Sequence, residues 1–293
     1  FDQVLTAISR GQASTGALVG RDLRPLWLER GWTLSVMGRY DEGVDALEAG
    51  LILDERKDDE VAGQLLLQTA RAETLLGVHD EALGHALAAE RIFTDRDDPR
   101  GLASTLRIIG DAHCEAGRPD EAAQALRRGL ALAERVGSAE EIGACLINLG
   151  LAEMERGELA EAVACDRRAI EEFERIGHGT GRAISYANLA EKLALRGDNE
   201  EALEQCAKAL ELSRAIGNSV TVADALRTAS RIRLEQGEFA DAAAQAEEAA
   251  KLFGEMGITR WEAESLELAA DALEQNGEGE RADTLRAEAR SLA

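Results

Sequence analysis

Apolar residues recur at spacings of three and four along almost the whole chain, and charged residues fill most of the positions between them. This spacing places the apolar side chains on one face of an α-helix. A glycine interrupts the pattern at regular intervals, as Gly157 does within residues 140–177, and the pattern then resumes. Because a left-handed glycine commonly ends a helix, we expect each interruption to be a turn between two antiparallel helices.

The interruptions repeat at a fixed period. The central glycine recurs first after 39 residues and then every 40, and an alanine follows five residues later in six of the seven copies. A small residue also recurs seven positions before each central glycine. Self-similarity at one period predicts stacked copies of a single unit. The central glycines are Gly38, Gly77, Gly117, Gly157, Gly197, Gly237 and Gly277. A second glycine ladder is formed by Gly137, Gly177, Gly217 and Gly257.

One helical pair cannot bury its apolar face alone, so the pairs must stack on one another. We therefore predict an all-α protein over residues 22–293: a right-handed α-solenoid of about seven helical hairpins, with about fourteen main helices. Residues 1–21 precede it and read as an N-terminal helix and connector, either the remnant of an earlier unit or a cap. In the loop 94–100 the capping glycine is missing, and Pro99 is predicted to begin the next helix.

These ladders resemble the tetratricopeptide repeat. Gly150, Gly157 and Ala162 match that family's small residue, turn glycine and alanine in order and spacing, and Leu146 matches its bulky residue. The resemblance covers about residues 23–293. The period of 40 differs from the family's usual 34. It is similar to the long-repeat branch in kinesin light chains, peptide-sensing bacterial regulators and the sensors of bacterial signalling ATPases.

The resemblance implies that the first helix of each pair lines a concave groove that binds a peptide or a partner segment. Asn148 and Asn188 occupy the same slot of adjacent first helices, and a carboxamide can both donate to and accept from a peptide backbone. The alternative, that they bridge neighbouring helices, remains open. Arginines at groove slots either grip ligand carboxylates or pair across repeats. The further candidate groove residues are Arg71, Arg107, Leu151, Glu191, Arg227 and Arg231.

Charge and cysteine content narrow the partners. A formal net charge of −23 argues against direct contact with nucleic acid, which requires clustered basic residues, and against anionic membrane surfaces. The sequence has no apolar run of transmembrane length and no secretory signal. None of the four cysteines forms a C-x-x-C pair, which predicts free thiols in a reducing, cytoplasmic setting.

No motif indicates catalysis. The sequence contains no H-E-x-x-H zinc motif, no Walker loop and no nucleophile elbow. The glycine-rich stretch 177–181 does not follow a strand pattern and is interpreted as a turn between units. The four histidines are scattered, and His113, at a slot where the family usually has an aromatic residue, is interpreted as a packed or half-buried residue rather than a ligand. We therefore expect no enzyme activity, no cofactor and no metal.

The sequence thus predicts a non-catalytic scaffold that binds protein or peptide. The resemblance implies the sensor or adaptor region of a larger bacterial regulatory protein. The chain begins with Phe1, and we expect it to be part of a longer protein. The alternative is a module for self-association, as a homo-oligomer, or for packing on an effector domain of the same protein.

Overall fold

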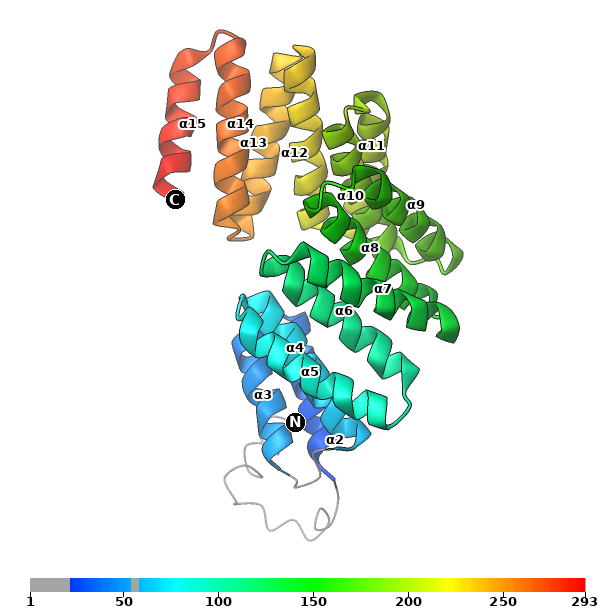
Figure 1. Ribbon diagram of the computed structural model, residues 1–293. Helices are drawn as coiled ribbons and strands as arrows, with labels where there is room; N and C mark the ends of the chain where they lie inside the picture. The colour runs from blue at the N-terminus through cyan, green and yellow to red at the C-terminus, as the bar shows by residue number, and fades with distance from the viewer. Residues whose placement is uncertain (1–21, 54–57, 293) are drawn as a thin grey trace. The chain divides into compact units, whose positions relative to one another are not determined.

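The computed structural model describes residues 22–53 and 58–292. Those residues form fourteen α-helices and no strand, which confirms the all-α prediction and the expected number of helices (Figure 1). The N-terminal helix and connector predicted at 1–21 lie outside the described residues. The helices are α2 (Arg24–Val36), α3 (Tyr40–Ile52), α4 (Glu60–Leu76), α5 (His79–Asp95), α6 (Pro99–Glu115), α7 (Pro119–Val136), α8 (Ala139–Glu155), α9 (Leu159–Arg175), α10 (Gly179–Arg196), α11 (Asn199–Ile216), α12 (Ser219–Gln236), α13 (Phe239–Glu255), α14 (Thr259–Gln275) and α15 (Gly279–Leu292).

The chain divides into two compact units, with the boundary between Arg96 and Asp97. The first unit contains α2–α5 and the second contains α6–α15, and within each unit consecutive helices pack against one another. We refer to the even-numbered helices as first helices and to the odd-numbered helices as second helices. A single solenoid that spans residues 22–293 without a break stays a prediction.

The two glycine ladders mark the turns. All eleven of their glycines have positive φ, for example 81° at Gly157. The N–H of Gly157 donates to the carbonyl of Met154, and the N–H of Glu158 donates to the carbonyl of Glu153. These two bonds satisfy carbonyl groups that the end of α8 would otherwise leave without partners. A side chain at Gly157 would strain this left-handed backbone, which is why the ladder is glycine.

The turn without a glycine uses an aspartate instead. Asp97 is the only non-glycine residue with positive φ, 51°, in the described chain. Asp and Asn tolerate this region better than other side chains. The carboxylate of Asp98 accepts hydrogen bonds from the N–H groups of Arg100 and Gly101 and so caps the next helix. Helix α6 begins at Pro99, as the sequence predicted.

The first helices of the second unit form its inner side. Helix α6 contacts α8, α8 contacts α10, α10 contacts α12, and α12 contacts α14. The second helices of this unit contact first helices but make no close backbone contact with one another within the described chain. The first helices of this unit therefore lie closer to one another than its second helices do.

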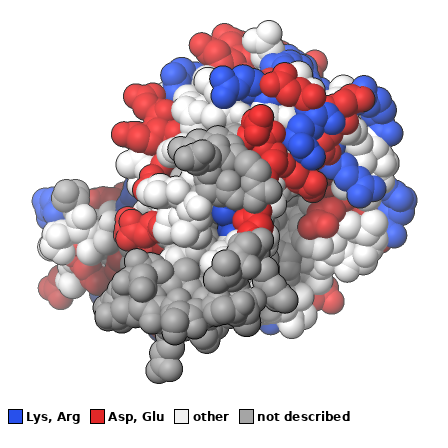
Figure 2. All heavy atoms as spheres, turned by 90° about the horizontal axis from the view of Figure 1, so that it is seen from below, with Lys and Arg blue, Asp and Glu red and all other residues white. Residues whose placement is uncertain are grey.

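Ion pairs connect the second helices at a distance. Each consecutive pair from α7 to α15 is joined by one arginine–glutamate pair with a nitrogen–oxygen distance of 2.5–2.9 Å. Both side chains of every pair are exposed, so each contributes only about 0–1 kcal/mol. Figure 2 shows basic and acidic side chains interspersed on the face that it draws. The pairs are Glu134–Arg168, Arg167–Glu201, Arg214–Glu248 and Glu247–Arg281.

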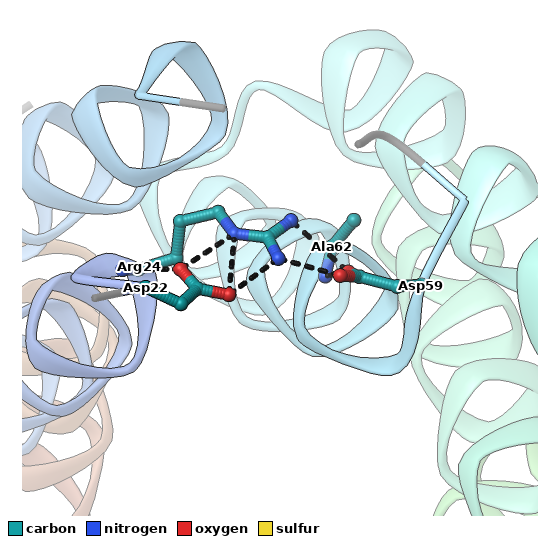
Figure 3. Close-up of polar contacts among 4 residues, drawn as sticks. All are labelled: Asp22, Arg24, Asp59 and Ala62. Atoms are coloured by element: carbon teal, nitrogen blue, oxygen red, sulfur yellow. Dashed lines mark hydrogen bonds and ion pairs between the residues drawn. The ribbon is translucent and has the colours of Figure 1, made fainter. Parts of the chain in front are cut away.

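In the first unit a buried arginine ties two helix starts together. Arg24 is 1% exposed, and its guanidinium pairs with the carboxylates of Asp22 and Asp59 (Figure 3). Asp59 also caps α4 by accepting from the N–H of Ala62. Because a guanidinium presents several donors in a fixed fork, one side chain fixes the first turns of α2 and α4.

Two further features of the structure are the apolar character of its helices and the state of its cysteines. None of the helices in the described chain is long and apolar enough to cross a bilayer. All four cysteines are free thiols, as predicted, and burial raises the pKa of Cys114, Cys145 and Cys206 to about 12. These thiols are therefore protonated at neutral pH and poor nucleophiles.

Candidate peptide-binding surface

The two predicted asparagines lie on adjacent first helices. Asn148 on α8 and Asn188 on α10 are both half-buried, and α8 contacts α10. No hydrogen bond joins either carboxamide to another residue of the described chain, so neither forms the bridge between helices that was the alternative. Both carboxamides keep two donors and an acceptor. Their contact with a ligand stays a prediction.

Apolar side chains surround the asparagines. Ile147, Leu151 and Met154 follow one another at spacings of four and three on α8 and are half-buried. Leu195 on α10 is 50% exposed. The surface therefore combines amide groups with apolar area that solvent reaches. We call it the inner face of α8 and α10, and it consists of Ile147, Asn148, Leu151, Met154, Asn188, Glu191 and Leu195.

Two of the predicted arginines are held by carboxylates of neighbouring repeats. Arg107 on α6 donates to Glu141 on α8 at 2.8 Å. Arg227 on α12 lies 3.8 Å from Glu191 on α10 and 3.8 Å from Glu264 on α14. For these two arginines the pairing between repeats is thus observed, and a ligand carboxylate would have to compete with it.

The environment of Arg227 is acidic. Asp224, one turn earlier on α12, lies 3.6 Å from its guanidinium. Desolvation raises the pKa of Asp224 to about 6; Arg227 opposes the rise and Glu191 adds to it. The guanidinium also lies 5.8 Å from the ring centroid of Trp261. This side of the inner face therefore favours cationic or neutral groups over anions.

The remaining candidate residues, Arg231 and Arg71, lie in different units of the chain. Arg231 on α12 is half-buried, and one of its terminal nitrogens is buried with no hydrogen-bond partner in the described chain. Arg71 is exposed on α4 and belongs to the first unit, so it is not placed with the others. The slot of the two asparagines holds Ile108 on α6 and Thr228 on α12, which are 1% and 3% exposed. Among the four helices α6, α8, α10 and α12, this slot is therefore accessible only on α8 and α10.

Two sequence profiles, both described as tetratricopeptide repeat, match the second unit. One matches residues 141–205 and 193–255, and the other matches residues 102–136. Together these matches span just over half of the chain. The chain belongs to the tetratricopeptide repeat family. No curated protein matches it.

Solved structures share the fold of this tetratricopeptide repeat chain. Aspartyl phosphate phosphatase F from Bacillus subtilis has a TM-score of 0.73 at 13% identity, over 99% of this chain and 74% of that one. A Rap protein complexed with Competence and Sporulation Factor has a TM-score of 0.65 at 16% identity, covering 99% and 81%. The signal transduction ATPase with numerous domains from Pyrococcus horikoshii, which has a tetratricopeptide repeat sensor, has a TM-score of 0.69 at 17% identity, covering 90% and 41%. This likeness confirms the α-solenoid fold, and the family supports a protein-interaction scaffold.

Sequence reasoning missed a buried ion pair between repeats. Lys192 on α10 is 2% exposed and contacts Asp166 on α9, which is 0% exposed. The signal was present in the ladder. In the other six repeats the slot of Lys192 holds only threonine, alanine or isoleucine, so a lysine there is out of pattern.

An accessible hollow lies in the first unit. It has a volume of about 290 Å³ and is lined by first helices α2 and α4. Trp32, half exposed, stands beside Gln68, which occupies the same slot as the two asparagines. Glu29 and Gln64 complete its polar lining. The first unit thus also combines carboxamide and apolar groups on its first helices.

Proposed function

We propose that this chain is a non-catalytic scaffold that binds an extended peptide or partner segment on the inner face of α8 and α10. One observation carries the proposal. Asn148 and Asn188 occupy the same slot of adjacent first helices, and neither has a side-chain partner in the described chain. Polar groups held at equivalent positions without partners are suited to a ligand that supplies them.

The spacing suits a peptide backbone. Neighbouring helices pack about 8–10 Å apart. An extended chain advances roughly 3.3 Å per residue. One asparagine per repeat would then meet the ligand at about every third residue. Because the carboxamide bonds to backbone N–H and C=O groups, these contacts would hold many sequences, while Leu151 and Leu195 would select apolar side chains.

The proposed setting is the sensor or adaptor region of a larger bacterial regulatory protein. Two structural neighbours support it: one carries a tetratricopeptide repeat sensor, and the other is complexed with Competence and Sporulation Factor. Four free thiols suit a reducing, cytoplasmic location. No cofactor is part of this function.

Peptide display can test the proposal without a known ligand. A library of unstructured peptides is selected on the wild-type chain alone, and the Asn148→Ala/Asn188→Ala double variant is kept for the titrations. Selected peptides are then titrated against both proteins by fluorescence anisotropy. Two lost hydrogen bonds should weaken binding about ten- to a hundredfold. Asn276→Ala is the matched control, because Asn276 is an exposed residue that follows α14.

The outcome separates the possibilities. Peptides that bind the wild type and the control equally, but the double variant weakly, support the inner face of α8 and α10. If selected peptides bind the double variant as tightly as the wild type, this surface is not the binding site.

Self-association is the second candidate, and one observation favours it. Trp32 and Val36 are one turn apart on α2, Met37 follows directly, and all three are between 50% and 66% exposed. Clustered apolar exposure marks interaction surfaces. Light scattering across a range of protein concentrations should then show a dimer that Trp32→Ala weakens. A constant monomer mass would exclude this candidate.

A further inference from the structure

Three potential metal ligands meet where the first two repeats pack together. Glu48 lies on α3, Glu73 on α4 and His85 on α5. One ligand atom from each lies within 4.8 Å of the other two, and Nδ1 of His85 is 2.8 Å from Oε2 of Glu73. The described chain contains no other such group of three.

The three side chains differ in solvent exposure, so the cluster is open to solvent on one side. The Glu73 side chain is 6% exposed and the His85 side chain is 30% exposed, whereas Glu48 lies at the surface. An ion could therefore enter from the side of Glu48 and be held from beneath by Glu73. An exposed glutamate can also change rotamer to reach it.

The site lacks a permanent positive charge. In the described chain no lysine or arginine forms an ion pair with Glu48 or Glu73. A carboxylate as buried as Glu73 requires compensation by a positive charge. His85 supplies it when protonated: its hydrogen bond with Glu73 raises the histidine pKa, and the charges of Glu73, Glu48 and Glu81 raise it further.

We propose that Glu48, Glu73 and His85 bind a divalent first-row transition-metal ion such as Zn²⁺. One imidazole nitrogen and two carboxylate oxygens are ligands that zinc accepts, and three protein ligands leave a fourth position for water. Bonds of about 2.0–2.2 Å place tetrahedral ligands roughly 3.4 Å apart. The hydrogen-bonded pair must open slightly and Glu48 must close in, which are movements of side chains alone.

The ion exchanges with a proton. Nδ1 of His85 can donate a lone pair to the metal only after the imidazolium releases its proton to solvent. Glu73 on α4, Glu48 on α3 and Glu81 on α5 are the charged groups that act on this imidazole, and all three are carboxylates. Binding therefore weakens as pH falls, because a metal ligand must be deprotonated.

The imidazole ligand also determines which metal ions the site prefers. Mg²⁺ and Ca²⁺ prefer six or more oxygen ligands and gain little from a histidine nitrogen. Zn²⁺, Co²⁺ and Ni²⁺ accept imidazole readily. The four cysteines do not complete the site, since none is among the three ligands.

Calorimetric titration of the full chain, prepared without a polyhistidine tag, tests the site with Zn²⁺ as the probe. We expect one ion per chain, no heat from Mg²⁺, and a heat that varies with the ionisation enthalpy of the buffer in proportion to the released proton. His85→Ala and Glu48→Gln should each weaken Zn²⁺ binding by about a hundredfold or more, since even outer partners of metal ligands contribute about 10- to 100-fold. His79→Gln, on the same helix, should bind as the wild type does.

Glu48→Gln keeps the test informative if His85→Ala does not fold, because Glu48 is exposed and makes no hydrogen bond in the described chain. Cobalt provides an independent readout, as Co²⁺ bound to nitrogen and oxygen ligands absorbs visible light. Absence of Zn²⁺ binding at pH 7.5 would overturn the proposal. Binding that survives Glu48→Gln unchanged would overturn it equally.

Discussion

The ammonium of Lys192 on α10 lies 2.5 Å from a carboxylate oxygen of Asp166 on α9, and neither side chain reaches solvent. The second carboxylate oxygen of Asp166 has no hydrogen-bond partner in the described chain. Desolvation raises the pKa of Asp166 in spite of Lys192, so burial costs this carboxylate more than the ion pair returns. The pair connects repeat four, which is α8 and α9, with repeat five, which is α10 and α11.

Replacing one residue of the Lys192–Asp166 pair should destabilise the fold far more than replacing both. Lys192→Met leaves a buried carboxylate without its cation and should lower the free energy of unfolding by about 3–5 kcal/mol. Lys192→Met combined with Asp166→Leu should restore stability to near the wild-type value, because an apolar pair requires no compensation. Urea unfolding of the three proteins measures both. A single variant that costs less than about 1 kcal/mol would show that water reaches the pair.

Gly150 should also resist substitution, because it packs closely against this ion pair. A Cβ at this position would lie 3.2 Å from both the Asp166 carboxylate and the Lys192 ammonium, and 3.3 Å from the carbonyl of Ala162. Overpacking of this kind costs about 1–3 kcal/mol.

Gly84 is the matched control for Gly150→Ala. It lies within α5, it is exposed, and a Cβ there would meet nothing within 4 Å. Gly84→Ala should therefore stabilise the protein by roughly 0.5–1 kcal/mol. Thermal unfolding should move in opposite directions for the two variants, and a fall for both would contradict the steric explanation.

Asp224 should make stability depend on pH. Its pKa is raised to about 6 in the folded chain, so the folded state holds the proton more tightly than the unfolded state does. Stability from this group is present at low pH and is lost as the pH rises from about 4 to 6. Asp224→Asn removes the titration, so the wild type should lose about 1–3 kcal/mol relative to the variant between pH 4 and pH 7. Unfolding free energies at both pH values measure this, and a constant difference would contradict it.

The groove asparagines should be dispensable for folding. Asn148→Ala and Asn188→Ala remove no side-chain hydrogen bond within the described chain, and alanine is the better helix former. We expect an unchanged or slightly higher melting temperature. Ser230→Ala is the contrasting variant, because the buried Ser230 hydroxyl donates to the carbonyl of Ala242 and its loss should cost about 0.5–1.5 kcal/mol. A drop of several degrees for either asparagine variant would instead indicate a bridge between helices.

The fold was predictable because its turns are encoded locally. A glycine such as Gly157 marks a left-handed backbone position without reference to any other part of the chain. Even the exception could be located, since the missing glycine and Pro99 indicated where α6 begins. What the period could not predict is the grouping into two compact units, because the central glycines Gly77 and Gly117 keep the 40-residue period across the boundary at Asp97.

The candidate site was only partly predictable. The slot of Asn148 and Asn188 was correctly placed on adjacent first helices, but a slot does not fix exposure: Ile108 and Thr228 occupy it and are buried. Contacts between helices were harder to anticipate. Lys192 and Asp166 are 26 positions apart, and nothing in a helical pattern states that two charged residues face each other.

The three residues of the proposed metal site illustrate the same limit. Glu48, Glu73 and His85 come from three helices, and in the sequence His85 is only one of four scattered histidines. Helix packing, not local pattern, brings their ligand atoms together. The repeat pattern indicates which residues occupy equivalent positions in successive repeats. It does not indicate which side chains contact each other between two repeats.

Because exposed ion pairs connect the second helices to one another, the second unit should stretch more easily on the side of its second helices than on the side of its first helices. On the side of the first helices, closely packed atoms leave almost nothing to compress. On the opposite side, a pair such as Arg214–Glu248 joins two helices through long, rotatable side chains at a free energy comparable with thermal energy. Bending therefore lengthens the outer side one pair at a time, while the inner side keeps its length and serves as the axis of the bend. Added salt screens these pairs and softens the bend without altering the core, so ionic strength adjusts the stiffness of the stack.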